Sequence, residues 1–482
     1  MTTNRIRIGG HGAEHIYVLG QMANRHGLVA GATGTGKTVT LQTLAEGFSC
    51  AGVPVFLSDI KGDLSGLAQA GQLNDRIEQR NAQLGINDYQ NRANPVIFWD
   101  LYGKNGHALR TTISDMGPVL LSALMELNET QTGVLHAVFR IADDQGLLLL
   151  DLKDLKAMLN WVSENAKSLQ ADYGSLPTQS INTIMRALLV VEEQGGDQFF
   201  GEPAMQLNDL MQIDFSGNGV ISILDATQLI HQPRLYSMFL LWLLSELFEQ
   251  LPEVGDLDKP KLVFFFDEAH LLFNSAPKAL LEKLEQVVRL IRSKGVGIYF
   301  VTQNPLDIPD NILGQLGHRI QHALRAFTPK DQKAVKVAAQ TFRQNPNIDT
   351  EQVITTLGVG EALVSVLDEK GTPGHVQHTL IAAPESRIGP LQEAERQLHL
   401  QRSPLRGKYD QLLDRQSAYE MLKQQHQAAA TAPTQKTTSS RRGREPDSIT
   451  TTLLKSVTRS IGSQLGRQIV RGVLGSLLGG KR

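Results

Sequence analysis

A glycine-rich loop near the amino terminus constrains the fold of this chain more than any other feature of its sequence. Residues 31–38 read GATGTGKT, which fits the pattern G-x-x-x-x-G-K-[ST]. The loop follows a short apolar run, residues 27–31, and opens a segment whose apolar residues recur with helical spacing. Glycines in such a loop let backbone N–H groups turn toward phosphate oxygens at the start of a helix. The sequence therefore predicts a strand, a phosphate-binding loop and a helix, the opening unit of an α/β fold.

The residue types of this loop indicate which groups would hold a nucleotide. Lys37 offers a cation to the β and γ phosphates, and the hydroxyl of Thr38 is a ligand for Mg²⁺. The loop thus predicts ATP and Mg²⁺ as cofactors. The nucleotide-binding residues that we expect are Gly31, Thr33, Gly34, Thr35, Gly36, Lys37, Thr38 and Val39.

Two acidic residues close a second apolar run, residues 261–268 (KLVFFFDE). Open parallel sheets place their sites at the carboxyl ends of the strands, so Asp267 and Glu268 are expected near the phosphate loop. Nucleotide hydrolysis needs a carboxylate on the metal side and a residue that activates water. We expect Asp267 to bind Mg²⁺ through water and Glu268 to polarise the attacking water. A pair of solvated acids that merely ends a strand is the alternative, and the phosphate loop weighs against it.

The next apolar run, residues 296–303, ends in Gln303, whose amide is expected to sense the γ phosphate and the attacking water. Arg292 lies just before this run. An arginine offered by a neighbouring subunit can stabilise the charge that develops on the phosphate, and Arg292 is chosen over Arg289 and Lys294 because it is nearest the turn. A solvated basic helix end is the alternative. The expected catalytic residues are Lys37, Glu268, Gln303 and Arg292.

Short apolar runs rich in Val, Ile and Phe alternate with segments of helical spacing, which is typical of a largely parallel sheet covered by helices. Further strands are expected at residues 53–59, 96–101, 219–225 and 319–326, with a hairpin at 361–367 and 375–382. Helices are expected, among others, at residues 119–141, 153–165, 180–193, 233–251 and 279–292.

The pattern divides the chain into five segments. Residues 1–110 and 216–400 are expected to be the two parts of an α/β nucleotide-binding core, the second of which includes the hairpin. Residues 111–215 lack strand signals and are expected to form a helical insertion. Residues 401–440 are expected to contain a helix and a low-complexity linker, and residues 441–482 a flexible, basic, amphipathic tail.

The motifs carry a resemblance to a known family. The phosphate loop, FFFDEAH at residues 264–270 and RSKGVGIYFVTQ at residues 292–303 resemble the motifs of the HerA/FtsK superfamily of P-loop ATPases, and in particular the bacterial HerA-like group typified by YjgR. The resemblance covers most of residues 5–400. It implies a RecA-like (ASCE) core that hydrolyses ATP. It also implies a homohexameric ring in which Arg292 is donated between subunits, acting as a helicase or translocase on DNA.

The same resemblance extends to supporting residues and partners. SDIKGD at residues 58–63 resembles the acidic-glycine turn of HerA-type motors, which implies that Asp59 and Asp63 lie near the site. His270 is expected to support the site or to pack beside it rather than to act in catalysis. DNA is the implied substrate, and a nuclease or another protein is the implied partner.

The balance of charge argues against a nucleic-acid surface over the whole chain. The 482 residues carry 47 Lys and Arg against 49 Asp and Glu, a formal net charge of −2. Any site for a polyanion must therefore be local. A single cysteine, Cys50, fits a reducing compartment, and no apolar stretch is long enough for a signal peptide or a membrane span. We therefore expect a cytoplasmic protein.

The tail leaves other functions open. Residues 441–482 carry nine Lys or Arg against two acidic residues, and their apolar residues recur on one face. Such a segment can lie on anionic lipid, grip nucleic acid or pack against a partner, or it can be a mobile tail. Two alternatives to a ring motor follow: a nucleotide-switched interaction protein, and a secretion-type ATPase recruited to a membrane or partner by this tail.

Overall fold

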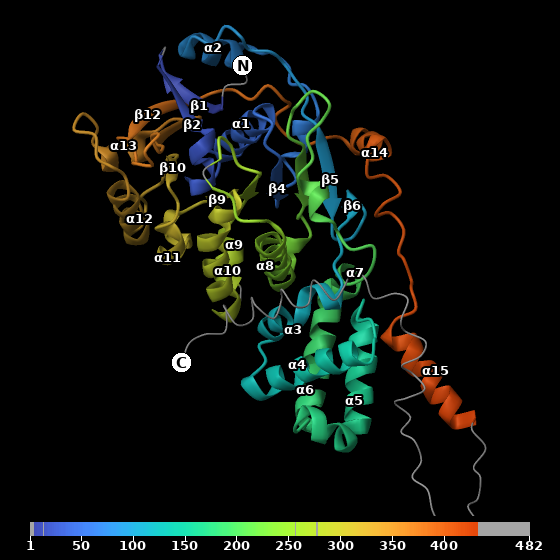
Figure 1. The fold of residues 1–482 in the computed structure, drawn as a ribbon. Coiled ribbons are helices and arrows are strands. Elements are labelled where there is room, and N and C mark those ends of the chain that lie inside the picture. Colours follow the sequence, from blue (N-terminus) through green and yellow to red (C-terminus); the bar gives the residue numbers. More distant parts are fainter. Residues whose placement is uncertain (1–3, 13, 256, 276–277, 432–482) are drawn as a thin grey trace, which may run out of the picture. The chain divides into compact units, whose positions relative to one another are not determined.

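The computed structural model describes residues 4–12, 14–255, 257–275 and 278–431 (Figure 1). These residues form two compact units. Residues 4–110 and 203–412 make up what we term the sheet unit, and residues 111–202 and 413–431 make up the helical unit. The expected basic tail, residues 441–482, lies outside the described residues, so its properties stay predictions.

The sheet unit is built on one twelve-stranded sheet in the order β2-β1-β12-β11-β10-β3-β9-β8-β4-β7-β5-β6. Its strands are β1 (Arg5–His11), β2 (Glu14–Leu19), β3 (Gly27–Ala30), β4 (Val55–Asp59), β5 (Val96–Asp100), β6 (His107–Ala108), β7 (Ile221–Asp225), β8 (Leu262–Phe266), β9 (Val296–Thr302), β10 (His318–Gln321), β11 (Glu361–Ser365) and β12 (Gln377–Ile381). The strands from β10 to β6 in this order are parallel, whereas β11, β12, β1 and β2 pair antiparallel.

The sequence pattern predicted most of this sheet correctly. All seven expected core strands are present, and the expected hairpin is β11 with β12. The run expected at residues 319–326 was too long, because β10 ends at Gln321. The next residue, His322, turns its side chain onto the hydroxyl of Thr40 instead of continuing the sheet. The hairpin of β1 and β2, which pairs with β12 at the edge, was not expected.

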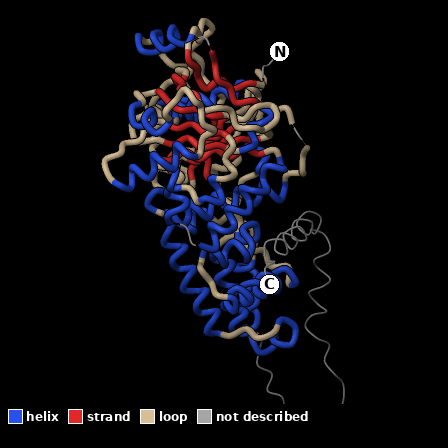
Figure 2. Tube along the Cα trace, turned by 90° about the vertical axis from the view of Figure 1, so that its left-hand side faces the viewer, coloured by secondary structure: helices blue, strands red, loops and turns tan. Residues whose placement is uncertain are grey.

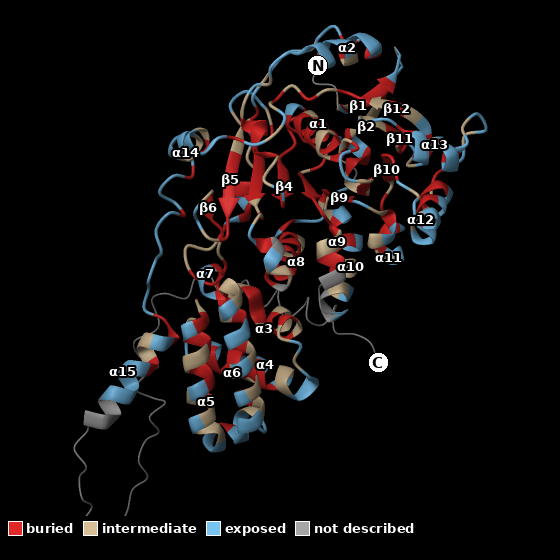
Figure 3. Cartoon of the chain, turned by 180° about the vertical axis from the view of Figure 1, so that it is seen from behind, coloured by how far each residue is buried: buried red, intermediate tan, exposed pale blue. Residues whose placement is uncertain are grey.

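Helices cover both faces of the sheet (Figure 2). Those of the sheet unit are α1 (Lys37–Cys50), α2 (Asp75–Leu84), α8 (Pro233–Gln250), α9 (His270–Ser275), α10 (Lys278–Ile291), α11 (Asp310–Leu313), α12 (Pro329–Gln340), α13 (Thr350–Thr356) and α14 (Glu393–Arg402). The central strands are buried on both faces (Figure 3), which is why their sequences are continuous apolar runs rather than alternating ones.

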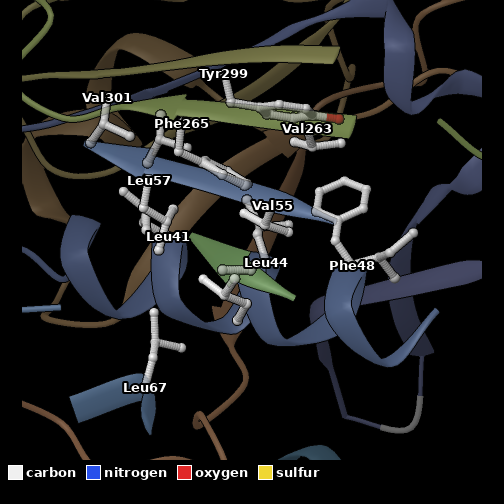
Figure 4. Packing of buried hydrophobic residues seen from close by; sticks show 14 of the residues in the cluster. Leu41, Leu44, Phe48, Val55, Leu57, Leu67, Val263, Phe265, Tyr299 and Val301 are labelled. Carbon is white, nitrogen blue, oxygen red and sulfur yellow. The ribbon is translucent and has the colours of Figure 1, made fainter. Parts of the chain in front are cut away.

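In the core beneath the phosphate loop, side chains of the central strands pack against α1 and against α8. In β8, Phe265 belongs to the cluster that includes Phe48 of α1 (Figure 4), and the two rings lie 6.1 Å apart between centroids. Its neighbour Phe264 packs against Phe56 of β4 at 5.1 Å, and Phe56 contacts Phe239 of α8 at 6.4 Å. Burial of each such ring contributes roughly 2 kcal/mol, so α1 and β8 are held firmly where the site is built.

The helical unit contains α3 (Ile113–Leu124), α4 (Glu129–Asp144), α5 (Leu152–Tyr173), α6 (Thr178–Val191), α7 (Asp197–Phe199) and α15 (Ala418–Thr431). The expectation of one helix over residues 119–141 was wrong, because α3 and α4 are separate. Glu126 has a left-handed φ of 52°, which ends the first helix, and the side chain of Asn128 forms a capping box with Gln131 that begins the second. Within the described ranges, no helix is long and apolar enough to cross a membrane.

Candidate functional site

The expected site residues meet at one edge of the sheet. β3, β9, β8 and β4 are adjacent and parallel, so their carboxyl ends lie side by side. The phosphate loop follows β3, Gln303 follows β9, Asp267 follows β8 and Asp59 ends β4. The fold therefore gathers side chains that are more than 200 positions apart in the sequence.

The phosphate loop is shaped by backbone conformations that favour glycine. Gly36, the residue before α1, has a φ of 112°, and a Cβ atom there would lie 3.1 Å from the backbone nitrogen of Gly360. No side chain of the described residues caps the amino end of α1, which leaves its first N–H groups facing the loop. Lys37 is buried, and its Nζ donates to the carbonyl oxygens of Gly31 at 2.7 Å and Ala32 at 3.0 Å.

The other loop residues differ in exposure. Thr33 and Gly34 are exposed at the tip of the loop, whereas Thr35 is buried beneath it. Thr38 and Val39 are partly exposed in the first turn of α1. The loop therefore presents both its tip and the start of α1 to a ligand.

A buried histidine supports the loop from below. His322 follows β10, and its ring hydrogen-bonds through Nε2 to Oγ1 of Thr40 at 2.8 Å and through Nδ1 to the carbonyl oxygen of Glu361 at 2.9 Å. Burial lowers the pKa of His322 to about 4, so the ring is neutral. The backbone N–H of Gly360 also donates to the carbonyl oxygen of Thr35 at 3.0 Å. Two contacts thus fix the phosphate loop to the start of β11.

The acidic turn after β4 holds its shape through Asp59. The two carboxylate oxygens accept the backbone N–H groups of Gly62 at 2.7 Å and Leu64 at 3.0 Å. Burial, with the nearby charge of Asp63, raises the pKa of Asp59 to about 7. Burial raises the pKa of Asp63 as well, and the nearby side chain of Thr38 acts against that rise. Asp59 therefore organises the turn, and Asp63 lies on the side of the turn near Thr38.

Asp267 and Glu268 have different environments although they are adjacent. Asp267 is buried, and Oδ1 accepts the backbone N–H of Glu268 at 2.9 Å. Burial raises the pKa of Asp267 to about 7, against the opposing charge of Lys61. Burial also acts on Glu268, but the hydrogen bond and charge of Lys61 outweigh it and lower the pKa of this carboxyl. Glu268 is therefore the ionised carboxylate of the pair at neutral pH.

The Glu268 carboxylate is contacted from three directions. Lys61 forms an ion pair with Oε1. Nε2 of Gln303 donates to Oε2 at 3.2 Å, and Nδ1 of His270 lies 3.1 Å from the same oxygen. Glu268 also has a φ of 47°, a left-handed conformation that costs a non-glycine residue roughly 1–3 kcal/mol. Strain of this kind persists only where the surroundings enforce it, as they do at functional sites.

Arg292 is not part of this cluster. It lies in the turn before β9, and Gln303 follows the other end of that seven-residue strand. The carbonyl oxygen of Arg292 accepts a hydrogen bond from Nδ2 of Asn24 at 3.4 Å, near the amino ends of the strands. Within one chain, Arg292 is therefore at the amino ends of the strands, whereas the phosphate loop is at their carboxyl ends.

Two residues of the site were missed from the sequence. The motif SDIKGD predicted no role for Lys61, although its position between Asp59 and Asp63 was a signal. His322 carried no signal, because its contacts with Thr40 and Glu361 are made across 282 and 39 positions of sequence.

The oxygen donors at this edge fit Mg²⁺. The hydroxyl of Thr38 and the carboxylates of Asp63 and Asp267 are hard ligands, and Mg²⁺ is usually held by a few protein oxygens together with phosphate oxygens. Oδ1 of Asp63 is buried and has no hydrogen-bond partner among the described residues. Among the residues that the structure describes, no group of three or more His, Cys, Asp or Glu side chains could hold a metal ion by itself. A metal here would be held jointly with the phosphates.

Comparison with known proteins gives a family match over nearly the whole chain. The family model described as "Helicase HerA-like C-terminal" matches residues 5–450 and again residues 432–482. Over 120 residues the chain is 31% identical to the probable helicase MJECL08 of Methanocaldococcus jannaschii. That stretch covers 24% of this chain and only 21% of the helicase.

Solved structures extend the likeness to the fold. The unbound monoclinic form of the bacterial conjugative coupling protein TrwBΔN70 has a TM-score of 0.54 at 14% identity, covering 80% of this chain and 90% of that one. The plasmid coupling protein TrwB in complex with the non-hydrolysable ATP analogue ADPNP has a TM-score of 0.53 at 14% identity, covering 77% and 88%. These similarities confirm the expected RecA-like P-loop ATPase fold.

Proposed function

The chain belongs to the HerA-like C-terminal helicase family, and from that premise we propose that it is a Mg²⁺-dependent ATP hydrolase. The observation that carries the proposal is the convergence of Lys37, Glu268 and Gln303 at one edge of the sheet, with Glu268 and Gln303 hydrogen-bonded to each other. Family membership supports the hydrolase, and the ATP analogue in the TrwB complex supports the nucleotide.

The phosphate loop performs the binding step. Backbone N–H groups of the loop and of the first turn of α1 face the phosphate oxygens, and Lys37 neutralises the β and γ phosphates. Thr38, Asp63 and Asp267 would hold Mg²⁺, Asp267 through water. When bound, the metal neutralises charge on the β and γ phosphates.

Glu268 and Gln303 perform the hydrolytic step. Gln303 orients a water molecule, and the Glu268 carboxylate accepts its proton as the oxygen attacks the γ phosphorus. The bond between that phosphorus and the β-phosphate oxygen breaks, which leaves ADP and inorganic phosphate. His270 and Lys61 hold the carboxylate in place. Because Glu268 is ionised near neutral pH, it can serve as the base without a preceding proton loss.

The proposed working form is a cytoplasmic homohexamer that translocates or remodels DNA. The helicase family and the coupling proteins, which are named for conjugation, support DNA as the substrate. The position of Arg292 supports the ring. An arginine at the amino ends of the strands is too far from its own subunit's phosphate loop and can reach only a phosphate bound to a neighbour. The negative net charge means that DNA contacts would be confined to local basic surfaces.

A second candidate is a nucleotide-switched interaction protein. Most of the helical unit, residues 111–202, interrupts the chain between β6 and β7. The unit is compact by itself, which favours a module that binds a partner. Recruitment to a membrane as a secretion-type ATPase is the other alternative, and it rests on the tail beyond the described residues.

The steady-state ATPase rate, measured with and without double-stranded DNA at low and moderate salt, tests the proposal together with the mass by light scattering. We expect a hexamer whose rate rises several-fold with DNA. Lys37→Ala should abolish turnover in the same assay. Hydrolysis that DNA does not change would favour the interaction protein, and an absence of hydrolysis would overturn the ATPase.

A further inference from the structure

Lys61 is a second cation at the phosphate loop, and neither the motif nor the proposed mechanism gives it a chemical task beyond holding Glu268. It lies in the turn after β4, one residue before Gly62, whose N–H group is bound by Asp59. The backbone at Lys61 is thus held in place, while its side chain is 38% exposed. Glu268, its ion-pair partner, is only 5% exposed. Lys61 therefore combines a contact to a buried carboxylate with a surface that a ligand can reach.

Lys61 and Lys37 lie on opposite sides of the catalytic side chains. Lys37 follows β3 and Lys61 follows β4, and the carboxyl ends of β9 and β8, with Gln303 and Glu268, lie between them. Cations on both sides of a site attract a polyanion such as a triphosphate. Lys37 faces the phosphate loop through Gly31 and Ala32, and Lys61 faces Glu268. A terminal phosphate that is held by Lys37 and attacked by a water molecule bound to Glu268 would lie between the two ammonium groups.

The hydrogen-bonding capacity of lysine allows both contacts at once. An ammonium group has three N–H donors, of which one serves the ion pair with Glu268. Oε2 of the same carboxylate is already contacted by Gln303 and His270. Lys61 is therefore the group that joins this carboxylate to the phosphate side of the site.

We propose that Lys61 couples the γ phosphate to Glu268. Its ammonium group holds Oε1 of Glu268 and also binds the γ phosphate, so that the carboxylate is aligned on the attacking water only when a triphosphate is bound. Lys61 is a positioning residue for Glu268 and a contact that distinguishes a nucleoside triphosphate from a diphosphate. This inference rests on the proposed ATPase function.

The test compares Lys61→Met with wild type in two measurements on the full-length protein. The first is the affinity for ADPNP relative to ADP by titration calorimetry with Mg²⁺, and the second is kcat and KM for ATP. We expect the preference for ADPNP over ADP to fall about tenfold or more, because a charged hydrogen bond to the γ phosphate is lost. Affinity for ADP should stay within about twofold, since ADP has no γ phosphate, and kcat should fall by more than KM rises.

Two further variants keep the test decisive. Lys61→Arg retains a cation and should keep most of the ADPNP preference with a partly reduced kcat. Lys104→Met, in the exposed turn after β5, is the matched control and should behave as wild type. If Lys61→Met fails to bind ADP at all, the same comparison is made with Lys61→Gln, which preserves length and polarity without the charge.

The outcomes separate this inference from the function on which it rests. A wild-type protein that does not hydrolyse ATP contradicts the ATPase function itself. If wild type hydrolyses ATP, an unchanged kcat in Lys61→Met overturns the inference. A lower kcat with an unchanged ADPNP preference also overturns it, because Lys61 would then hold Glu268 without contacting the phosphate.

Discussion

Nε2 of Gln303 donates a hydrogen bond of 3.2 Å to Oε2 of Glu268, which joins the ends of neighbouring strands β8 and β9. This arrangement lets the amide and the carboxylate hydrogen-bond to the same water molecule. Because Glu268→Gln keeps the shape but removes the proton acceptor, we expect kcat to fall about 100-fold or more while the Kd for ATP changes little. Steady-state kinetics and calorimetry measure the two quantities. Glu351→Gln, on the exposed side of α13, is the control, and unchanged hydrolysis in Glu268→Gln would remove Glu268 from the mechanism.

The position of Arg292 leads to a prediction about mixed assemblies. In one chain it lies at the amino ends of the strands, opposite the phosphate loop at their carboxyl ends, so it can act only in a neighbouring subunit. We expect an equal mixture of Arg292→Ala with wild type to show less activity than the mean of the two proteins, because one defective subunit impairs its neighbour. Arg289→Ala, which changes an exposed residue one turn earlier on α10, should leave activity unchanged. Activity simply proportional to the wild-type fraction would argue against a shared site.

The fold was largely predictable because its information is local. The central strands are continuous apolar runs, and most of them are followed by a helix, so the parallel core could be predicted from the period and length of the apolar segments. The hairpin of β1 and β2 was missed although its own pairing is local, with Arg5 opposite Leu19. In β1 the apolar residues alternate with Arg5 and Arg7 and so do not form the continuous run that marks the central strands. The break between α3 and α4 was missed because it depends on the φ of Glu126 and the cap at Asn128, which apolar periodicity does not reveal.

The candidate site was predictable where a residue follows a strand of the core. Asp267 and Gln303 could be placed together because parallel strands end at one edge of a sheet. Lys61 and His322 could not be assigned roles, since their functions arise from contacts with Glu268 and Thr40 that only the folded chain creates. Their prediction would require the order of the strands, which the sequence pattern does not provide.

Buried histidines predict how stability depends on pH. Burial lowers the pKa of His26 to about 4, and both ring nitrogens are used, Nε2 toward the carbonyl of Val288 and Nδ1 toward the N–H of Ile298. An unfolded histidine titrates near 6.5, so the unfolded state binds more protons between about pH 6.5 and pH 4. This contribution to stability is present above that range and is lost as the pH falls through it. As the pH falls from 6.5 to 5, each such histidine lowers the free energy of unfolding by roughly 2 kcal/mol.

The contribution of His26 is best measured as a difference from wild type. Asp59 and Asp267, whose pKa values are raised to about 7, act in the opposite direction over the same range. His26→Asn removes the titrating ring and keeps a polar side chain at this position, where φ is 59° and ψ is 166°. We expect its loss of stability in urea unfolding to be smaller at pH 5 than at pH 7.5 by roughly 2 kcal/mol. His231→Asn, at an exposed position, is the control, and an equal loss at both pH values would contradict the prediction.

The edge strand β6 is covered by a segment, residues 403–410, that follows α14. Nε2 of His107 in β6 contacts Oγ of Ser403 at 2.7 Å, and Nδ1 contacts Oδ1 of Asp410 at 3.1 Å. Tyr409 packs against Trp99 of β5 at 5.3 Å between ring centroids. Exposed edge strands invite pairing with other chains, and a bound segment blocks that pairing. Ser403, His107 and Asp410 contact one another in the order of a serine hydrolase triad. However, Oγ of Ser403 also accepts the backbone N–H of Leu405, which fits a structural role for these contacts.

A double-mutant cycle tests whether these side chains fasten the segment to the edge. We expect His107→Ala to lower the free energy of unfolding by about 1–3 kcal/mol, because it removes a buried ring together with both of its hydrogen bonds. Ser403→Ala should lower it by less, since Ser403 is only partly buried. The double variant should lose less than the sum of the two, with a coupling of about 0.5 kcal/mol or more by urea unfolding. Strictly additive losses would show that the two side chains act independently. Nucleotide affinity should be unchanged in all three variants, because β6 lies at the far edge of the sheet from β3.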